Sequence, residues 1–200
     1  MSATSRLLQQ RSVGEVKLCV ERHGVTHIRE SGASKVRLPR GSNEAILINT
    51  GGGIAGGDSF SIDISVGQDA RLTVTSQAAE RVYQTLGPFA ATVVKLKAGA
   101  GAALHWLPQE TIIYEGAALR RDYLVELDAG SKFLAVEPLV FGRSQMGETV
   151  TEIRLMDIWR IRRGGSLAHV DALTFGPGLP GSKATLAGAA ALATIVYVAE

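Results

Sequence analysis

Carboxylates are the residues of this sequence best placed to carry chemistry. Six of them stand at expected strand ends or within apolar surroundings: Asp58, Glu110, Glu115, Glu137, Glu148 and Asp171. Glu137 in LAVEPLVFGR and Asp171 in LAHVDALTF are the most conspicuous, because a bare charge in an apolar strand is costly to bury. Each should therefore form a salt bridge, with Arg143 or Arg163 as candidate partners, or face a wet channel lined by several such groups.

Other kinds of catalytic or metal site find little support. The sequence has four histidines, which form no strong cluster: His23, His27, His105 and His169. His23 and His27 have the i, i+4 spacing that would place two metal ligands on one face of a helix. The segment around the first two reads as a strand, a glycine turn and another strand. The single cysteine, Cys19, excludes an intrachain disulfide and a CxxC zinc site, and no G-x-S-x-G nucleophile motif is present. The sequence therefore predicts a protein that is not an enzyme and binds no cofactor tightly.

A glycine-rich segment, NTGGGIAGGD at 49–58, follows an apolar strand at 45–48. Gly51, Gly53 and Gly56 satisfy the G-x-G-x-x-G pattern of dinucleotide-binding folds, but that pattern requires a helix directly afterwards. The next residues, SFSIDISV, alternate between polar and apolar types, as a strand does. We interpret the segment as a strand connection in which glycines allow positive φ or close backbone approach.

Alternation of this kind indicates a mostly β protein. In SFSIDISV, Phe60, Ile62 and Ile64 fall on one face, and the same period recurs in four other segments: 71–75, 92–97, 123–127 and 152–159. Helical patterns are weak, and we expect short helices only at 78–86 and, near the C-terminus, at 182–193.

Three segments share a pattern of strand, glycine turn and strand, at intervals of about thirty residues: IDISVGQDARLTV, VKLKAGAGAALHW and VELDAGSKFLAV. Leu72, Leu104 and Leu134 take equivalent places. The turns are expected near Gly67, residues 99–101 and Gly130. A unit of this size cannot bury its own apolar face, so successive units must stack. We expect a β-helical stack of two sheets, a solenoid- or sandwich-like fold, with a few short C-terminal helices. A parallel βαβ fold is disfavoured, because crossover helices are missing.

The composition indicates a single β-rich globular domain over residues 1–200, with 46% apolar and 20% charged residues and a net charge of +2. Its basic residues are scattered among acids, which does not favour nucleic-acid binding. The first twelve residues lack the apolar run of a signal peptide, and the apolar stretch at 186–199 is too short to cross a bilayer. We expect a cytoplasmic protein with no membrane contact.

Four motifs, in this order and at these separations, resemble the urease accessory protein D family, called H in some organisms: NTGGGIAGGD, LTVTSQAAERVY, LHWLPQETIIYEGA and FGRSQMGE. The resemblance covers residues 37–171 and extends more weakly to the C-terminus. It implies a non-enzymatic scaffold, built as a β-helical stack of two sheets, that is required to install nickel in apo-urease. It also implies binding to urease on one side and to accessory protein F on the other. The GTPase G would complete the assembly, and nickel would pass in transit through a water-filled tunnel.

Carried onto this sequence, the resemblance implies that Asp58, Glu137 and Asp171 contact nickel in transit. Such a path needs weak, successive oxygen contacts rather than a tight cage. The resemblance also assigns a structural or partner-binding motif: Gly51, Gly52, Gly53, Gly56, Gly57, Tyr83, Gly142, Arg143, Gly147 and Glu148. Ser59 stands where some relatives carry a second acid, so a paired-carboxylate gate at the loop is not supported. Family chains continue past residue 200, and we therefore expect a C-terminal truncation relative to the family.

Two other functions stay open on the sequence alone. A carboxylate hydrolase on a β-solenoid would place two acids about 5 to 9.5 Å apart across a sugar bond. It would also need an aromatic-lined groove, and a content of 6% aromatic residues argues against one. A purely structural binding module would dock a partner through its glycine loop and would lack a polar route through its interior.

Overall fold

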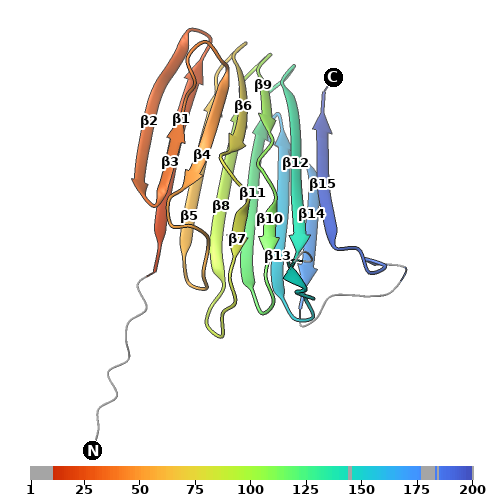
Figure 1. Cartoon of the computed structure of the whole chain (residues 1–200). Helices are drawn as coiled ribbons and strands as arrows, with labels where there is room; N and C mark the ends of the chain where they lie inside the picture. The colour runs from red at the N-terminus through yellow and green to blue at the C-terminus, as the bar shows by residue number, and fades with distance from the viewer. Residues whose placement is uncertain (1–10, 144–145, 177–182, 184, 200) are drawn as a thin grey trace, which may run out of the picture.

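The computed structural model describes residues 11–143, 146–176, 183 and 185–199, and its strands form two sheets that pack on each other (Figure 1). The first sheet has the spatial order β14 (Ser166–Phe175), β13 (Arg154–Arg163), β11 (Ala118–Leu127), β8 (Ala90–Ala98), β5 (Ser59–Val66), β1 (Val13–Glu21) and β2 (Gly24–Gly32). The second has the order β3 (Ser34–Arg37), β4 (Glu44–Asn49), β6 (Arg71–Ser76), β9 (Ala103–Trp106), β12 (Lys132–Phe141), β10 (Thr111–Ile113) and β7 (Glu80–Val82). β15 (Ala191–Val198) pairs with β12 as the remaining strand of this sheet. The expected mostly β stack of two sheets is confirmed.

Neighbouring central strands run parallel although no helix connects them. The chain passes from one sheet to the other and back, so that β5 leads into β6, β8 into β9 and β11 into β12. Each circuit returns the chain to the first sheet, where β5, β8 and β11 lie side by side. The second sheet thus provides the crossover that a helix supplies in a βαβ unit. The colours of Figure 1 show this progression across the molecule, from β2 at one end to β15 at the other.

Three equivalent turns connect these strand pairs at one end of the molecule. In each, an amide donates to the carbonyl three residues earlier: Ala70 to Gly67 at 3.2 Å, Ala102 to Gly99 at 3.0 Å and Ser131 to Asp128 at 3.2 Å. The turns also bond to the neighbouring circuit, since the Gly99 amide donates to Val66 and the Asp128 amide to Ala98. The turns predicted from the repeat are confirmed at all three places.

The third repeat unit is displaced by one residue from the predicted alignment. β9 and β12 pair Leu104 with Phe133, so Phe133 rather than Leu134 takes the equivalent core position. Phe133 is fully buried, whereas Leu134 points away from the core. The reason lies in the turns. Gly67 is the first residue of its turn, but Gly130 is the third of its own, where the backbone has a φ of 69°. An alignment guided by the glycines therefore misplaced the strand that follows.

Neither of the two expected helices is present in the described residues. Residues 80–82 of the 78–86 segment form β7, which pairs in parallel with β10. In the 182–193 segment, residues 182 and 184 lie outside the described part, 185–188 form a turn, and 191–193 begin β15. The free edges of β10 and β12 offer backbone hydrogen bonds that a weak helix preference does not outweigh. Nor does the described part of the chain contain a helix long and apolar enough to span a membrane.

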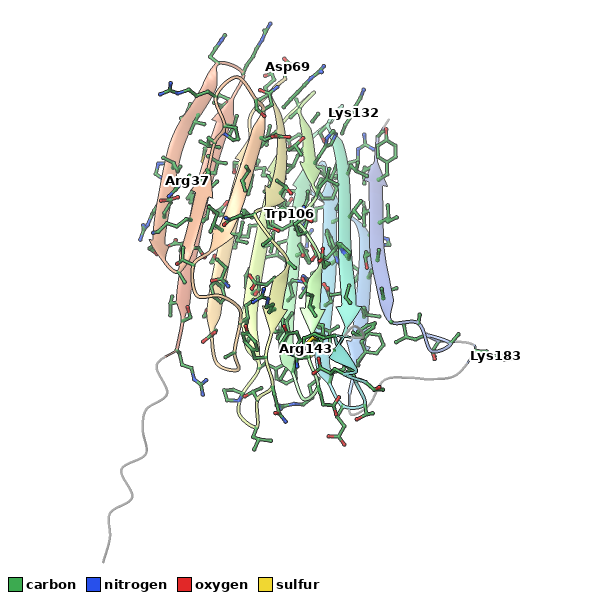
Figure 2. All side chains as sticks on the ribbon, in the orientation of Figure 1. Arg37, Asp69, Trp106, Lys132, Arg143 and Lys183 are labelled. Atoms are coloured by element: carbon green, nitrogen blue, oxygen red, sulfur yellow. The ribbon has the colours of Figure 1, made fainter. Side chains whose placement is uncertain are left out.

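The core lies between the sheets, where alternate residues of each strand point inward. Three aromatic residues join its two sides: Tyr123 stacks on Trp159 with ring centroids 3.7 Å apart, and Trp106 meets Tyr123 edge-on at 6.1 Å. In Figure 2, Trp106 lies midway between the end that carries Asp69 and Lys132 and the end that carries Arg143. The middle of the stack is therefore a place where aromatic side chains from the two sheets meet.

Candidate functional site

A cavity of about 260 Å³ between the two sheets is the candidate site. Polar side chains from both sheets line it, Thr92 and Arg121 from the first sheet and Thr111 and Glu137 from the second. The segments 52–54, 76–81 and 108–109 line it as well: Gly52, Gln77 and Gln109 are among the exposed residues. The cavity therefore opens to the surface beside these segments and reaches polar groups in the interior.

Arg121 on β11 lies between two buried carboxyl groups. Its Nη1 donates to Glu137 Oε1 on β12 at 2.5 Å, and its Nε donates to Asp157 Oδ2 on β13 at 3.2 Å. Nη2 also donates to Asp157 Oδ2, and Nη1 to Thr111 Oγ1 at 3.1 Å. The three charged side chains are each at most 7% exposed. Burial disfavours the charge of Arg121, but Glu137, Tyr123 and Asp157 together outweigh that effect and raise the pKa of the guanidinium.

The second oxygen of Glu137 is held from both sheets. Tyr123 OH donates to Oε2 at 2.6 Å, and Trp106 Nε1 donates to the same atom at 2.9 Å. Burial raises the pKa of Tyr123 well above its ordinary value, and the neighbouring Glu137 raises it further. Tyr123 is therefore a hydrogen-bond donor throughout the physiological pH range, and Glu137 is fixed in position by neutral and charged donors together.

Three polar residues of the first sheet form one inward-facing row. Thr92, Arg121 and Asp157 are register partners on β8, β11 and β13. Two oxygens of this row, Thr92 Oγ1 and Asp157 Oδ1, are buried without a hydrogen-bond partner. The cluster thus combines two carboxyl groups with one guanidinium and has acceptor capacity left over. An arrangement of this kind can hold a water molecule or a transient cation, but no described residue completes a tight cage around it.

Glu80 lines the cavity near its opening. Asn49 Nδ2 donates to both Glu80 carboxylate oxygens, at 3.2 and 3.1 Å. Burial raises the pKa of Glu80 above its ordinary value, and the hydrogen bond from Asn49 opposes that rise only in part. A carboxyl group that binds a proton more readily than usual therefore stands on the path between the surface and the interior cluster.

The glycine-rich segment closes this side of the cavity by close backbone packing. A Cβ added to Gly53, which has a φ of 145°, would lie 2.4 Å from the Tyr83 ring and 2.9 Å from the Arg81 carbonyl oxygen. Tyr83 OH in turn donates to the Gly52 carbonyl at 3.0 Å. At the end of the segment, Asp58 accepts hydrogen bonds of 2.8 Å from the amides of Ser12 and Ala55. The interpretation as a strand connection that requires glycine is confirmed.

The remaining residues of the predicted partner motif gather at the end of the molecule that carries Arg143 in Figure 2. The Arg143 guanidinium lies 4.5 Å above the Tyr114 ring, and Tyr83 meets Tyr114 edge-on at 5.3 Å. Arg143 Nε donates to Glu148 Oε2 at 2.8 Å, and this hydrogen bond lowers the pKa of Glu148. Gly142 and Gly147, which directly precede Arg143 and Glu148, carry positive φ angles of 74° and 72°. These residues form one local surface cluster on three loops.

The three acids predicted to lie along a route are not brought together. Glu137 is at the centre of the cavity cluster, and its ion-pair partner is Arg121 rather than Arg143 or Arg163. Asp58 is buried within its loop, as described above. Asp171 lies on the edge strand β14, in register with Trp159, and is exposed, because no described strand of the second sheet covers β14 there. Of the three, only Glu137 lines the cavity.

Sequence reasoning missed three residues of the site: Arg121, Asp157 and Glu80. The alternation pattern contained a signal for the first two. Arg121 shares its face with Tyr123 and Val125, and Asp157 shares its face with Leu155 and Trp159, so both are charges on an apolar face of a predicted strand. No such signal marked Glu80, because its segment was interpreted as a helix.

The fold and the cavity together define a solenoid-like β scaffold with a buried polar cluster in an otherwise apolar core. The model of the UreD urease accessory protein family matches residues 12–200, and the chain belongs to that family. The chain is 46% identical to the urease accessory protein UreD of Xanthobacter autotrophicus, over 99% of this chain and 72% of that protein. It is 43% identical to UreD of Rhodopseudomonas palustris, over 86% of this chain and 63% of that protein. For UreD of Rhizobium etli the identity is 44%, over 87% of this chain and 67% of that protein.

Membership of this family confirms the resemblance inferred from the four motifs. It also agrees with the prediction that the chain is an accessory protein rather than an enzyme. The matched regions span between 63% and 72% of the length of these three relatives.

Proposed function

We propose that this chain is a cytoplasmic scaffold for the insertion of nickel into apo-urease and that it bridges urease and the accessory proteins F and G. One observation carries the proposal. In a chain of the urease accessory family, a cavity leads from the surface to a buried cluster of carboxyl groups between the sheets. A scaffold that only held its partners together would not need polar groups in its interior, where their burial is costly.

Nickel is the cargo in this proposal, and the cavity is part of its path. Divalent nickel accepts oxygen ligands, and a path requires contacts weak enough to release the ion. Glu80 and Glu137, which both line the cavity, would supply such contacts in succession. Among the residues that the structure describes, no three His, Cys, Asp or Glu side chains are grouped to hold a metal ion. The proposed passage therefore relies on single oxygen contacts.

Asp58 and Asp171 remain predicted nickel contacts outside the cavity. Asp58 would contribute only if its loop opened, because its two oxygens accept backbone amides in the present arrangement. Asp171 is accessible on β14 without any rearrangement. At the end of the molecule that carries Arg143, the surface cluster of Tyr83, Arg143 and Glu148 is the proposed partner contact. Its charged and aromatic groups remain partly exposed.

The proposal is tested by co-expressing this chain with the cognate urease operon that lacks its own D component. The variants are Glu137→Gln and a matched control, Glu126→Gln, which alters an exposed carboxylate on the outer face of β11. Pull-down of urease measures assembly, and the nickel content of the recovered urease measures delivery. We expect Glu137→Gln to preserve the complex and to lower nickel content several-fold, whereas Glu126→Gln leaves both unchanged.

Other outcomes assign the role differently. Normal complex and normal nickel content for Glu137→Gln would contradict the interior path and favour a purely structural binding module. Failure of the wild-type chain to restore any urease activity would contradict the accessory function itself. A urease-independent hydrolytic activity that is lost in Glu137→Gln would favour the carboxylate hydrolase.

A further inference from the structure

The outer faces of the two sheets differ in character. On the first sheet, charged residues such as Lys17, Asp63 and Asp122 point outward and form ion pairs across the strands. On the second sheet, the outward positions of β10 and β15, and those of β12 after Lys132, are apolar. Register pairs Leu134 with Tyr197, Val136 with Ile195 and Ile112 with Val140. We name these six residues the apolar outer face.

The apolar outer face is open at its β15 side. Ile195 and Tyr197 are each 68% exposed, so no described segment packs over them. Alternation along β15 is regular, with Val196 and Val198 packed against the core and the residues between them pointing outward. Contiguous exposed apolar area of this kind marks an interaction surface more often than a free surface.

Basic side chains border this face at two places. Arg81 on β7 is the register partner of Ile112, and Lys132 lies two residues before Leu134 on β12, so both point outward beside the apolar residues. Arg71 and Lys132 lie in one row, on either side of Ala103. Within the described part of the chain, neither of them forms an ion pair. The rim is thus positively charged and available for an acidic partner.

We propose that the apolar outer face binds a segment of a partner protein that is apolar on one side and carries Asp or Glu along its flank. This inference rests on the function proposed above, because the partner belongs to the urease assembly. An apolar centre supplies contact area, while complementary charges at a rim set orientation and association rate. A second copy of this chain fits less well, since facing copies would bring one basic rim against another.

An anionic membrane would also attract basic groups, but the geometry favours a protein. Except for Ile195 and Tyr197, the apolar residues are half-buried between neighbouring side chains of a sheet. A flat face of this kind matches the surface of another folded element, whereas insertion into lipid requires apolar groups that project below the headgroups.

The test measures the binding of this chain to purified cognate apo-urease and to purified accessory protein F. Two variants alter the face: Ile195→Glu removes apolar contact, and Arg71→Glu combined with Lys132→Glu reverses the rim. Two matched controls alter the outer face of the first sheet. Val170→Glu replaces an exposed apolar residue on the edge strand β14, and Lys95→Glu with Lys97→Glu reverses two exposed lysines on β8.

We expect each face variant to weaken the binding of one of the two proteins by about tenfold or more, and each control by less than about twofold. Binding of the wild type should weaken as salt rises, whereas the rim variant should lose most of that dependence. Circular dichroism and thermal unfolding of every variant establish that the fold is kept. The milder pair Arg71→Gln and Lys132→Gln should give an intermediate loss.

Several outcomes would overturn the inference. If the wild type binds its partners and the face variants bind equally well, the proposed function stands and the face is not the contact. If the wild type binds neither protein, both proposals fail. A dimer of the wild type that Ile195→Glu dissociates would assign the face to a second copy. Cosedimentation with phosphatidylserine vesicles that the rim variant abolishes, without any change in protein binding, would assign it to a membrane.

Discussion

Tyr123 in the first sheet donates a hydrogen bond of 2.6 Å to Glu137 in the second, so a polar contact crosses the middle of an apolar core. The Tyr123 ring also stacks on Trp159, with an angle of 9° between the planes. The contact therefore ties β11, β12 and β13 together at the height of the cavity. It makes the cluster part of the fold as well as a candidate for function.

Replacing different members of the buried cluster around Arg121 should lower the free energy of unfolding by unequal amounts. Arg121→Gln would leave Glu137 and Asp157 buried without their shared cation, and we expect a loss of about 3 to 5 kcal/mol in the free energy of unfolding. Glu137→Gln leaves one ion pair, Arg121 with Asp157, and keeps an acceptor for Tyr123, so it should cost clearly less. Urea unfolding at pH 7 measures both. An equal cost for the two variants would show that charge balance does not determine the stability of the cluster.

Glu80 should make stability fall as pH rises. Its folded-state pKa is raised by burial, so the folded protein binds this proton more tightly than the unfolded chain does. Stability therefore decreases as pH rises from the ordinary pKa of 4.5 through the raised value. Glu80→Gln should accordingly increase the free energy of unfolding at pH 7, and the gain should shrink toward pH 4. The measurement is urea unfolding at both pH values, with Glu126→Gln as control. A destabilised Glu80→Gln at pH 7 would mean that the hydrogen bonds from Asn49 outweigh burial.

Gly53→Ala should destabilise the glycine-rich segment. The added methyl group would meet the Tyr83 ring and the Arg81 carbonyl, and the φ of 145° is strained for any other residue. We expect a loss of about 2 to 4 kcal/mol. Gly52→Ala separates the two effects, because its φ is 74° but nothing lies within 4 Å of the added Cβ. It should cost about 1 kcal/mol. Thermal unfolding compares the two, and equal losses would exclude the steric contact with Tyr83.

Replacing Phe133 by alanine should lower the free energy of unfolding far more than replacing its neighbour Leu134. Phe133→Ala would leave a cavity in the core and cost about 3 to 5 kcal/mol. Leu134→Ala removes an outward side chain of the apolar outer face and should cost about 1 kcal/mol or less. Chemical denaturation of the two variants checks the register of the third repeat unit. The reverse order would restore the alignment predicted from the glycines.

Much of the fold could be predicted because alternation and repetition are local signals. The inward and outward faces of β5, β8 and β11 follow directly from period-2 patterns, and the turns follow from the repeat. The prediction of a helix at 182–193 was wrong because an alanine-rich composition carries no information on the free edge of β12, with which β15 pairs. Edge pairing is a tertiary effect, and it overrides local preference.

The candidate site was harder to predict because its members are far apart in the sequence. Glu137 could be singled out as a charge in an apolar strand, but its partner Arg121 precedes it by 16 residues and lies on the opposite sheet. Only the pairing of β11 with β13 places Asp157 beside the same guanidinium. Asp171 showed the same local pattern as Glu137, yet it lies on an edge strand, where burial does not follow from alternation.

The three stacked turns restrict where the chain can change in length. Each turn has four residues, 67–70, 99–102 and 128–131, whereas the connections that lead back to the first sheet have seven, four and twelve, at 83–89, 114–117 and 142–153. One residue inserted in the turn at 99–102 would move Trp106 outward and His105 into the core, since neighbouring strand residues face opposite sides. At the end that carries Arg143, by contrast, the connections differ in length from one circuit to the next. An affinity tag, a fluorophore or a grafted recognition loop should therefore be placed beside Leu86 in the connection 83–89, where the side chain is fully exposed and every circuit of the solenoid stays in register.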